Sequence, residues 1–202
     1  MLNKVFDGIR SAVVISIGCS VFLACENRVI GAVLFSVALI TICLKGYNLY
    51  TGRIGFIPEK HSREDVSSLL LGLLGNVIGS LLFGLLIRSA LANLGETALT
   101  LCTAKLTQTA YSTLVRGFFC GILMYIAVST FREKNTLAGV LFCVPVFILS
   151  GFEHSIADMV YFAMAGIISP DAFVFILLVL LGNTLGAMLL PVLGMVGRKD
   201  KA

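Results

Sequence analysis

The segment Ser150-Gly-Phe-Glu-His-Ser-Ile-Ala-Asp158 sets three ionisable side chains within an otherwise apolar region. The two acids and the histidine are flanked by uncharged runs at 135–152 and 159–170. An ionisable group at bilayer depth costs roughly 2.5–3.5 kcal/mol on insertion scales, so such groups are retained mainly where they face protein or water. An unperturbed imidazole titrates near pH 6.5 and can therefore exchange a proton close to neutral pH. The segment is predicted to be a functional site.

The elements that must position this site are predicted to be membrane helices. Of the 202 residues, 58% are hydrophobic and 13% are charged, and the mean hydropathy is +1.00. Soluble domains average about 45–50% apolar and about 25% charged residues. The chain is therefore predicted to be an all-α integral membrane protein, with room for about six spans and none for a soluble domain. The net charge of +4 does not indicate nucleic-acid binding, because the basic residues form no stripe.

Two short motifs indicate that the chain consists of two related halves. Gly75-Asn-Val-Ile-Gly-Ser-Leu-Leu82 and Gly182-Asn-Thr-Leu-Gly-Ala-Met-Leu189 share the pattern GNxxGxxL. Each half would hold three spans, an odd number, so the halves must run in opposite directions across the membrane. We therefore predict a single transmembrane domain over 1–202, with inverted repeats at about 8–95 and 108–198.

Spans two and five are both predicted to be broken. Lys45–Gly55 contains glycines and two charges where span two should still be in the bilayer, and Ser150-Gly151 is where span five is expected to open. Irregular backbone at membrane depth is tolerated only where it lines a cavity or is buried in protein. Paired, glycine-interrupted segments in inverted repeats mark a substrate path near the midplane. The path is predicted to run between 45–55 and 150–158.

The distribution of basic residues predicts the orientation. With both termini in the cytoplasm, the inside loops hold far more Lys and Arg than the outside loops, as the positive-inside rule requires. The inside set is Lys4, Arg10, Arg53, Lys60, Arg63, Arg132, Lys134, Arg198, Lys199 and Lys201, and the outside set is Arg28, Arg88 and Lys105. The chain is expected to be a multi-pass protein of the cell inner (plasma) membrane.

Four motifs in this chain resemble those of the formate/nitrite transporter family, whose members are pentameric anion channels with aquaporin-like protomers. The motifs are Gly151-Phe-Glu-His-Ser-Ile-Ala157, Leu49-Tyr-Thr-Gly52 (similar to the family's LFTG), the paired GNxxG segments, and Arg116-Gly117 at the start of span four. The resemblance implies a homopentamer in the lipid bilayer. It would pass a small monovalent weak-acid anion of the formate, nitrite or hydrosulfide class, together with protons, and would need no cofactor or metal.

The same resemblance implies roles for individual residues. His154 corresponds to the central pore histidine, Thr51 to the loop threonine that faces it, and Asn183 to a pore-side asparagine. The apolar constrictions would involve Phe35, Leu39 and Phe147, and Lys105 resembles a vestibule lysine that attracts anions. The supporting positions are Glu153, Asp158, Asn76, Leu49 and Tyr50.

Several of these residues also have structural interpretations. His154 would also fit a packed histidine that ties a carbonyl at the helix break, and Asn76 and Asn183 would fit hydrogen-bonded links between helices. Glu153 and Asp158 would fit acceptors for the free amides of the following half-helix, because carboxylates suit helix N-termini. The apolar residues would also fit ordinary packing.

Two positions depart from the family pattern. Asp158 stands where asparagine is usual, and Arg53 stands where asparagine is common. Asp158 adds negative charge beside an anion path and is therefore expected to pair with Arg53 or Lys45. Outside the resemblance, Lys105 would be a solvated loop residue and Arg116 would reach the headgroups.

Three other functions fit parts of the sequence. A neutral-solute pore of the aquaporin kind would suit the fold, but the chain contains no Asn-Pro-Ala. A cation-coupled carrier would use Glu153 and Asp158 as its ion site and would depend on sodium. An enzyme is not expected, because no nucleophile or metal set accompanies the histidine and the acids. We prefer the anion channel, in which His154 stabilises or protonates the anion between apolar constrictions, where a bare charge would cost many kcal/mol.

Overall fold

The computed structural model describes residues 1–199, and within them every regular element is helical. The elements are α1 (Leu2–Ala24), α2 (Arg28–Lys45), α3 (Tyr50–Arg53), the 3₁₀ turn η1 (Ile54–Phe56), α4 (Arg63–Ala90), α5 (Ala92–Leu106), α6 (Ala110–Lys134), α7 (Ala138–Leu149), α8 (Ser155–Ala165) and α9 (Pro170–Lys199). Lys201 lies outside the described residues, and so do the side chains of Arg198 and Lys199.

Five of the described helices, α1, α2, α4, α6 and α9, are long and apolar enough to cross a membrane. The apolar helices α7 and α8 have only 12 and 11 residues, so neither can cross alone, because a span needs about 20. Helix α5, with 15 residues, connects α4 to α6. The prediction of an all-α membrane protein is confirmed, while the count of six spans stays a prediction.

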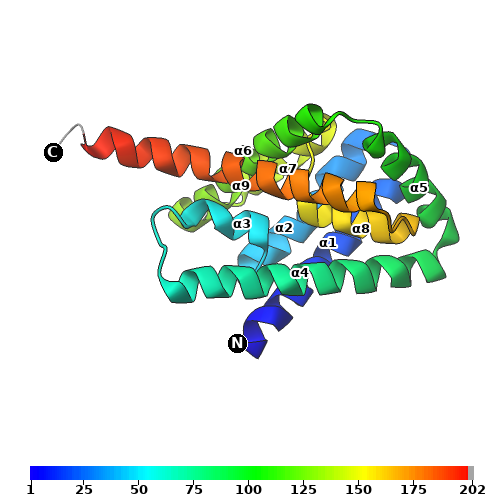
Figure 1. Ribbon diagram of the computed structural model, residues 1–202, viewed down its shortest axis with the longest axis horizontal. Coiled ribbons are helices and arrows are strands. Elements are labelled where there is room, and N and C mark those ends of the chain that lie inside the picture. Colours follow the sequence, from blue (N-terminus) through cyan, green and yellow to red (C-terminus); the bar gives the residue numbers. More distant parts are fainter. Residues whose placement is uncertain (200–202) are drawn as a thin grey trace.

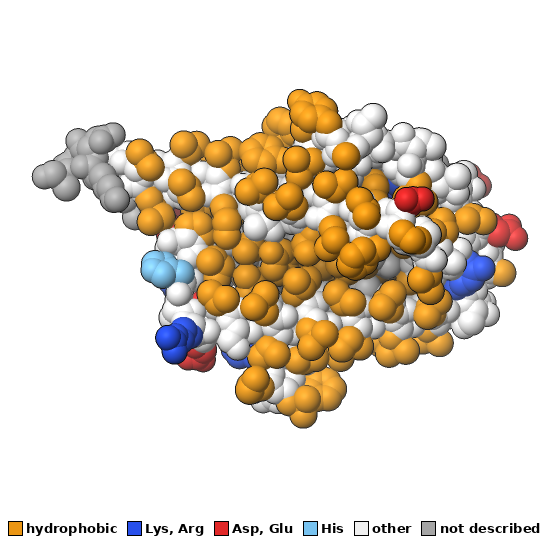
Figure 2. All heavy atoms as spheres, in the orientation of Figure 1, with side chains coloured by type: hydrophobic (Ala, Val, Ile, Leu, Met, Phe, Trp, Pro, Cys, Tyr) orange, Lys and Arg blue, Asp and Glu red, His pale blue; other side chains and the backbone are white. Residues whose placement is uncertain are grey.

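The surface of the molecule suits a lipid environment. Helices α4 and α9 extend along the longest axis, with α3 toward one end of the molecule and α5 at the other (Figure 1). Hydrophobic side chains cover the middle of the face in Figure 2, and most of the charged ones lie toward the two ends. Large apolar residues on α4 and α9 are openly exposed, such as Leu82 at 57% and Leu181 at 48%. A broad apolar band between charged ends is favourable in a bilayer and costly in water.

Both predicted breaks are present. The chain turns at Gly46 between α2 and α3, with φ of +68°, and at Gly151 between α7 and α8, with φ of +70°. Glycine adopts this left-handed backbone without the Cβ clash that other residues suffer. The opening expected at Ser150-Gly151 is therefore explained by the local backbone chemistry of that dipeptide.

Asn76 of α4 holds the first break in place. Its Oδ1 accepts the N–H of Tyr50 at 2.9 Å, and its Nδ2 donates to the carbonyls of Asn48 at 3.0 Å and Gly8 at 2.9 Å. The side chain is fully buried. One amide therefore satisfies irregular backbone that would otherwise be left without hydrogen bonds inside the membrane.

Asn183 of α9 does the same at the second break. Its Oδ1 accepts the N–H of Ser155 at 2.9 Å, and its Nδ2 donates to the carbonyls of Glu153 at 2.9 Å and Gly117 at 2.8 Å. It too is fully buried. The asparagines of the two GNxxG motifs thus link helices through equivalent hydrogen bonds, which is the structural interpretation of both residues.

Replacing Asn183 with alanine is expected to destabilise the protein by about 3 kcal/mol or more. The change leaves one N–H and two carbonyls buried without partners, and each such group costs about 1–3 kcal/mol. The midpoint of thermal unfolding in detergent should fall clearly, whereas Asn93→Ala, at an exposed position of α5, should leave it unchanged. Equal midpoints for the two variants would contradict the linking role of Asn183.

Candidate functional site

Two cavities extend into the molecule from its opposite ends. The larger, about 400 Å³, lies beside α5 and is called here the α5 cavity. The smaller, about 170 Å³, lies beside α3 and is called the α3 cavity. No residue lines both cavities. The side chains between them therefore decide what can pass from one to the other.

His154 and Thr51 join the two breaks between these cavities. Thr51 Oγ1 and His154 Nε2 are 2.8 Å apart, and the side chains belong to residues that are only 1% and 3% exposed. His154 lines the α5 cavity, whereas Leu49 and Gly52, close to Thr51 in the chain, line the α3 cavity. The structure thus brings together the histidine and the threonine that the family resemblance pairs.

The hydrogen bonds of His154 define its tautomer. Its Nδ1 lies 3.1 Å from the backbone nitrogen of Ala157, in the first turn of α8. A backbone N–H can only donate, so Nδ1 is the acceptor and carries no proton. In the neutral ring the proton is therefore on Nε2, from which it is donated to Thr51 Oγ1. His154 is the N-cap of α8, and a proton on Nδ1 would break that cap.

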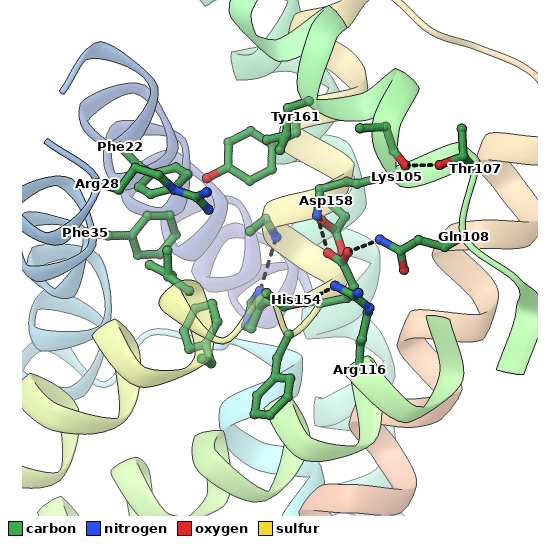
Figure 3. Close-up of a pocket in the computed structure, with 18 residues that line it drawn as sticks. Phe22, Arg28, Phe35, Lys105, Thr107, Gln108, Arg116, His154, Asp158 and Tyr161 are labelled. Carbon is green, nitrogen blue, oxygen red and sulfur yellow. Dashed lines mark hydrogen bonds and ion pairs between the residues drawn. The ribbon is translucent and has the colours of Figure 1, made fainter. Parts of the chain in front are cut away.

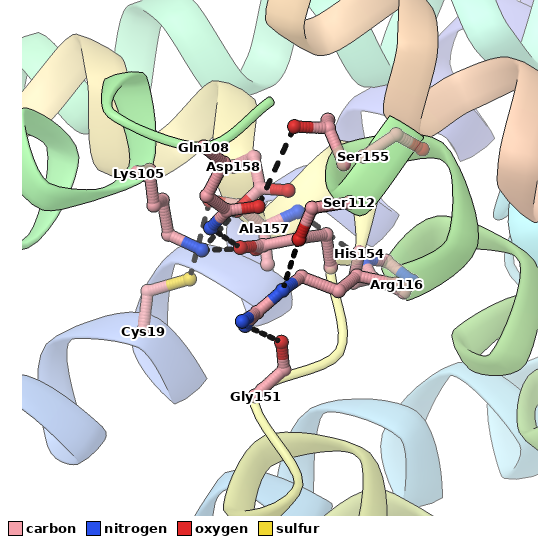
Figure 4. A network of polar contacts seen from close by, with 12 residues as sticks. Cys19, Lys105, Gln108, Ser112, Arg116, Gly151, His154, Ser155, Ala157 and Asp158 are labelled. Atoms are coloured by element: carbon pink, nitrogen blue, oxygen red, sulfur yellow. Dashed lines mark hydrogen bonds and ion pairs between the residues drawn. The ribbon is translucent and has the colours of Figure 1, made fainter. Parts of the chain in front are cut away.

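Glu153 and Asp158 form a buried cluster with Lys105 of α5. Lys105, Gln108 and Asp158 lie close together in Figure 4. Lys105 Nζ contacts Glu153 Oε2 and lies 3.0 Å from Asp158 Oδ1. Gln108 Nε2 donates to Glu153 Oε1 at 2.8 Å. The two carboxyl side chains are 3% and 2% exposed, and that of Lys105 is 12% exposed. Buried charges of this kind persist only when they are paired and hydrogen-bonded.

This cluster corrects two expectations. The partner of Asp158 is Lys105, and neither Arg53 nor Lys45 contributes, because α5 packs against α8 and brings the lysine to the aspartate. The carboxylates also do not accept the amides at the start of α8. Those amides are bound by the ring of His154 and by the side-chain oxygen of Asn183.

Arg28 and Arg116 give the α5 cavity positive charge that no carboxylate neutralises (Figure 3). Arg116 donates from Nη1 to Gly151 O at 2.8 Å and from Nε to Ser112 Oγ at 3.1 Å, so it faces the break. Within the described part of the chain, neither arginine forms an ion pair. Lys105 lines the same cavity, but two carboxylates already bind it. The resemblance implies that Lys105 attracts anions, whereas the cavity cations without a carboxylate partner among the described residues are the two arginines.

Two phenylalanines form an apolar wall beside His154. The ring of Phe147 stacks on the imidazole with centroids 5.8 Å apart, and Phe35 meets Phe147 edge-on at 6.2 Å. Both line the α5 cavity. Leu39 is buried in the same apolar cluster and lines neither cavity, whereas Leu49 lines the α3 cavity. The wall would oppose a fully hydrated anion at the entrance to the His154 position.

Some expected site residues lie elsewhere, and others were not expected. Asn183 and Tyr50 line neither cavity, and the hydroxyl of Tyr50 is bound to Thr184 Oγ1 at 2.9 Å. Phe22, Gln108 and Tyr161 line the α5 cavity without any motif that marks them (Figure 3). Of these three residues, Gln108 has a signal in the sequence, because it follows Lys105 by three residues.

The fold of this chain matches that of two solved structures. A solved structure described as an FNT family ion channel superposes with a TM-score of 0.78, covering 98% of this chain and 88% of that chain at 23% identity. A structure described as a pentameric formate channel with formate bound gives a TM-score of 0.74, covering 98% and 94% at 22% identity. The arrangement of helices and breaks is therefore the one found in these channels.

The sequence comparisons assign the family. A family model described as formate/nitrite transporter matches residues 1–196, so the chain belongs to the formate/nitrite transporter family. The chain is 33% identical over 156 residues to the uncharacterized transporter YwcJ of Bacillus subtilis, covering 69% of this chain and 60% of that protein.

Two further relatives have assigned names. The nitrite transporter NirC of Salmonella typhimurium is 29% identical over 180 residues, covering 79% of this chain and 67% of that protein. The formate channel FocA of Escherichia coli K12 is 28% identical over 159 residues, covering 71% and 55%. The chain thus spans between 55% and 67% of the length of these three curated relatives.

Proposed function

We propose that this protein is a channel or transporter for small monovalent weak-acid anions of the formate, nitrite or hydrosulfide class. The proposal rests on the hydrogen bond between His154 and Thr51, which lies between two cavities that open toward opposite ends of the molecule. Membership of the family supports it, since relatives are named as a nitrite transporter and a formate channel.

An anion reaches the site through the α5 cavity. Arg28 and Arg116 raise its local concentration there, because uncompensated positive charge in a cleft focuses the field on oppositely charged ions. Beyond them, the wall formed by Phe35 and Phe147 strips water from the ion. A bare charge at that point would cost many kcal/mol, so compensating donors are required directly behind the wall.

His154 and Thr51 are the donors that replace the lost water. The Nε2–H of the neutral ring is donated to Thr51 Oγ1 at rest, which leaves the threonine proton free to point at an incoming anion. Each hydrogen bond polarises the next in such a chain. An anion that approaches Nε2 can take the ring proton as its own hydrogen bond and keep the threonine donor as a second one.

Transfer of a full proton from His154 to the anion needs one more step. A neutral ring that lost its Nε2 proton would become an imidazolate, so the ring must first gain a proton on Nδ1. That proton displaces the bond from the Ala157 N–H, which is the N-cap of α8. Proton transfer is therefore coupled to a local opening of the first turn of α8, whereas stabilisation by hydrogen bonding needs no such change.

The assembly and topology follow the same family argument. We propose a homopentamer, since a solved relative is described as pentameric, with both termini in the cytoplasm and the protein in the inner membrane. No enzymatic activity is proposed. Native mass measurement of the detergent-solubilised protein tests the stoichiometry. The topology is tested by adding protease to intact cells, in which a tag on the N-terminus of the protein should be protected.

A flux panel in proteoliposomes tests the function against its rivals. We expect uptake of formate, nitrite or hydrosulfide above that of empty liposomes, faster at about pH 5.5 than at about pH 7.5, because more of each weak acid is then neutral. Water permeability should equal that of empty liposomes, which argues against an aquaporin-like pore. Uptake should be the same in sodium and in potassium buffer, which argues against a carrier that uses Glu153 and Asp158 as a cation site. Absence of flux for all three anions would refute the proposal.

Replacing Thr51 with valine should lower anion flux about tenfold, while Thr51→Ser should stay close to the wild type. Valine has nearly the same shape but lacks the hydroxyl, and one hydrogen bond to a charged group contributes about 1.5–3 kcal/mol. Initial rates at saturating formate or nitrite measure the effect. Identical rates for the valine and serine variants would exclude Thr51 as a donor to the anion.

A further inference from the structure

We propose that the α3 cavity is a second anion-binding site, in which the guanidinium groups of Arg53 and Arg132 hold a planar monovalent oxyanion such as formate or nitrite. The identity of the anion rests on the proposed function, but the site is separate from His154. It lies at the mouth opposite the α5 cavity and contains none of the residues of that cavity.

The two arginines enter this cavity from different helices. Arg53 ends α3, two residues after Thr51, and Arg132 lies in the last turn of α6. Both line the cavity of about 170 Å³, together with apolar residues and the glycines at the first break. A space of this size suits a small ion, and the flat fork of a guanidinium matches a planar oxyanion in a bidentate manner.

The guanidinium of Arg132 is held in place without using up its donors. It lies over the ring of Phe56 with its carbon 4.2 Å from the ring centroid. A cation stacked on an aromatic face keeps the N–H groups at its edge available for a ligand. Within the described residues Arg132 has no hydrogen bond and no ion pair, so its donors have no partner in the protein.

Arg53 donates one hydrogen bond to the backbone, and its guanidinium has further N–H donors. Its Nη2 donates to the carbonyl of Gly46 at 3.0 Å, at the end of α2. A cation there suits the C-terminus of a helix. A guanidinium has five N–H donors, so four are still free for a ligand in the cavity. The helix ends therefore explain part of the position of both arginines, since Arg132 lies in the last turn of α6, but they do not explain why both side chains line one cavity.

The charge around this cavity is only partly compensated, because Asp7 acts on Arg53 from outside the cavity without forming an ion pair with it. No acidic residue lines it. Asp7 is close to the first break, where its carbonyl accepts the N–H of Asn48 at 3.3 Å, but its carboxylate is bound by Arg10 at 2.9 Å. The α5 cavity also has two arginines without an ion pair, but unlike the α3 cavity it contains carboxylates, which bind Lys105. The α3 cavity is thus lined by two cations that form no ion pair within the described residues.

The hydrogen bond between Asp7 and Asn48 also indicates from which side of the protein anions reach the second site. It places the N-terminus and the α3 cavity on the same face of the protein. The second site therefore acts on anions that enter from the N-terminal face. It should lower the half-saturating anion concentration for entry from that face and leave the value for the opposite face unchanged.

A charge series at Arg132 tests the site. Arg132→Lys keeps the charge, Arg132→Gln removes it and Arg132→Glu reverses it, and Lys134→Gln is the matched control at an exposed position two residues away. Initial formate flux is measured in sealed vesicles of each orientation at low ionic strength, with the N-terminal tag reporting the orientation. Arg132 is exposed and stacks on Phe56, so the variants should assemble, and elution in size-exclusion chromatography verifies this.

We expect the half-saturating formate concentration for entry from the N-terminal face to rise about fivefold in Arg132→Gln and further in Arg132→Glu. The estimate follows from loss of one unit charge a few ångströms from the ion at a partly solvated site. Arg132→Lys keeps the charge but loses the bidentate fork, so its half-saturating concentration should lie between those of the wild type and Arg132→Gln. Lys134→Gln should match the wild type, as should maximal rates and entry from the opposite face. The difference should shrink at high salt, which screens the charge.

Failure of the second site and failure of the proposed function give different results in this experiment. If wild-type vesicles conduct formate and all four variants share its half-saturating concentration at both faces, the second site is refuted and the proposed function stands. If the wild type conducts none of the anions, the proposed function itself fails. A rise of equal size at both faces would also refute the site, because it would not act on one mouth.

Discussion

Replacing His154 with asparagine is expected to reduce the flux of formate or nitrite by about 10- to 100-fold. The ring supplies the Nε2–H donor that meets the anion behind the phenylalanine wall. One hydrogen bond to a charged group is worth about 1.5–3 kcal/mol, and the factor follows from that range. The variant should also lose any pH dependence of the flux that arises from protonation of the imidazole.

Asparagine is the informative substitution because it preserves the local structure. Asparagine is among the best N-cap residues, so its side-chain oxygen can accept the amide of Ala157 as Nδ1 of the histidine does. His154→Phe removes the cap and the donor together and should cost about 1 kcal/mol of stability in addition. The two variants therefore separate the capping role from the transport role.

The measurement is initial flux into proteoliposomes at two pH values, with the thermal midpoint recorded for each variant. A fall in flux with an unchanged midpoint in His154→Asn supports a direct role in conduction. Flux equal to the wild type at both acid and neutral pH would remove His154 from the mechanism and leave it only as the cap of α8.

Replacing Lys105 with methionine should have the largest effect on stability. The change leaves the carboxylates of Glu153 and Asp158 buried side by side without a cation. Breaking a buried pair by removing one partner costs about 3–5 kcal/mol. We expect little correctly assembled protein, or a strongly lowered thermal midpoint in detergent.

A compensating variant distinguishes charge from packing. If unpaired charge is the cause, adding Glu153→Gln and Asp158→Asn to Lys105→Met should restore most of the lost stability, because the amides are neutral and nearly the same size. Lys60→Met, at an exposed position in the loop before α4, is the control and should be neutral. A triple variant as unstable as Lys105→Met would show that the lysine acts by packing alone.

The sequence by itself determined that this is a helical membrane protein and where two of its helices are broken. Hydropathy predicted membrane helices because burial in lipid depends on the side chains of each segment alone. Glycine and charge predicted both breaks, since backbone conformation at Gly46 and Gly151 is a local property. The four motifs also pointed to the family that the family model assigns.

Only the tertiary structure decided which groups meet. Thr51 and His154 are 103 residues apart in the chain, and Lys105 and Glu153 are 48 apart. No local pattern specifies that α5 carries a lysine to Asp158, or that Arg53 and Arg132 share a cavity. The direction of the asparagine at position 183, toward backbone and away from the path, is likewise set by its neighbours. Charge pairing and hydrogen-bond direction depend on distances of a few ångströms between segments, and such distances exist only after the helices have packed.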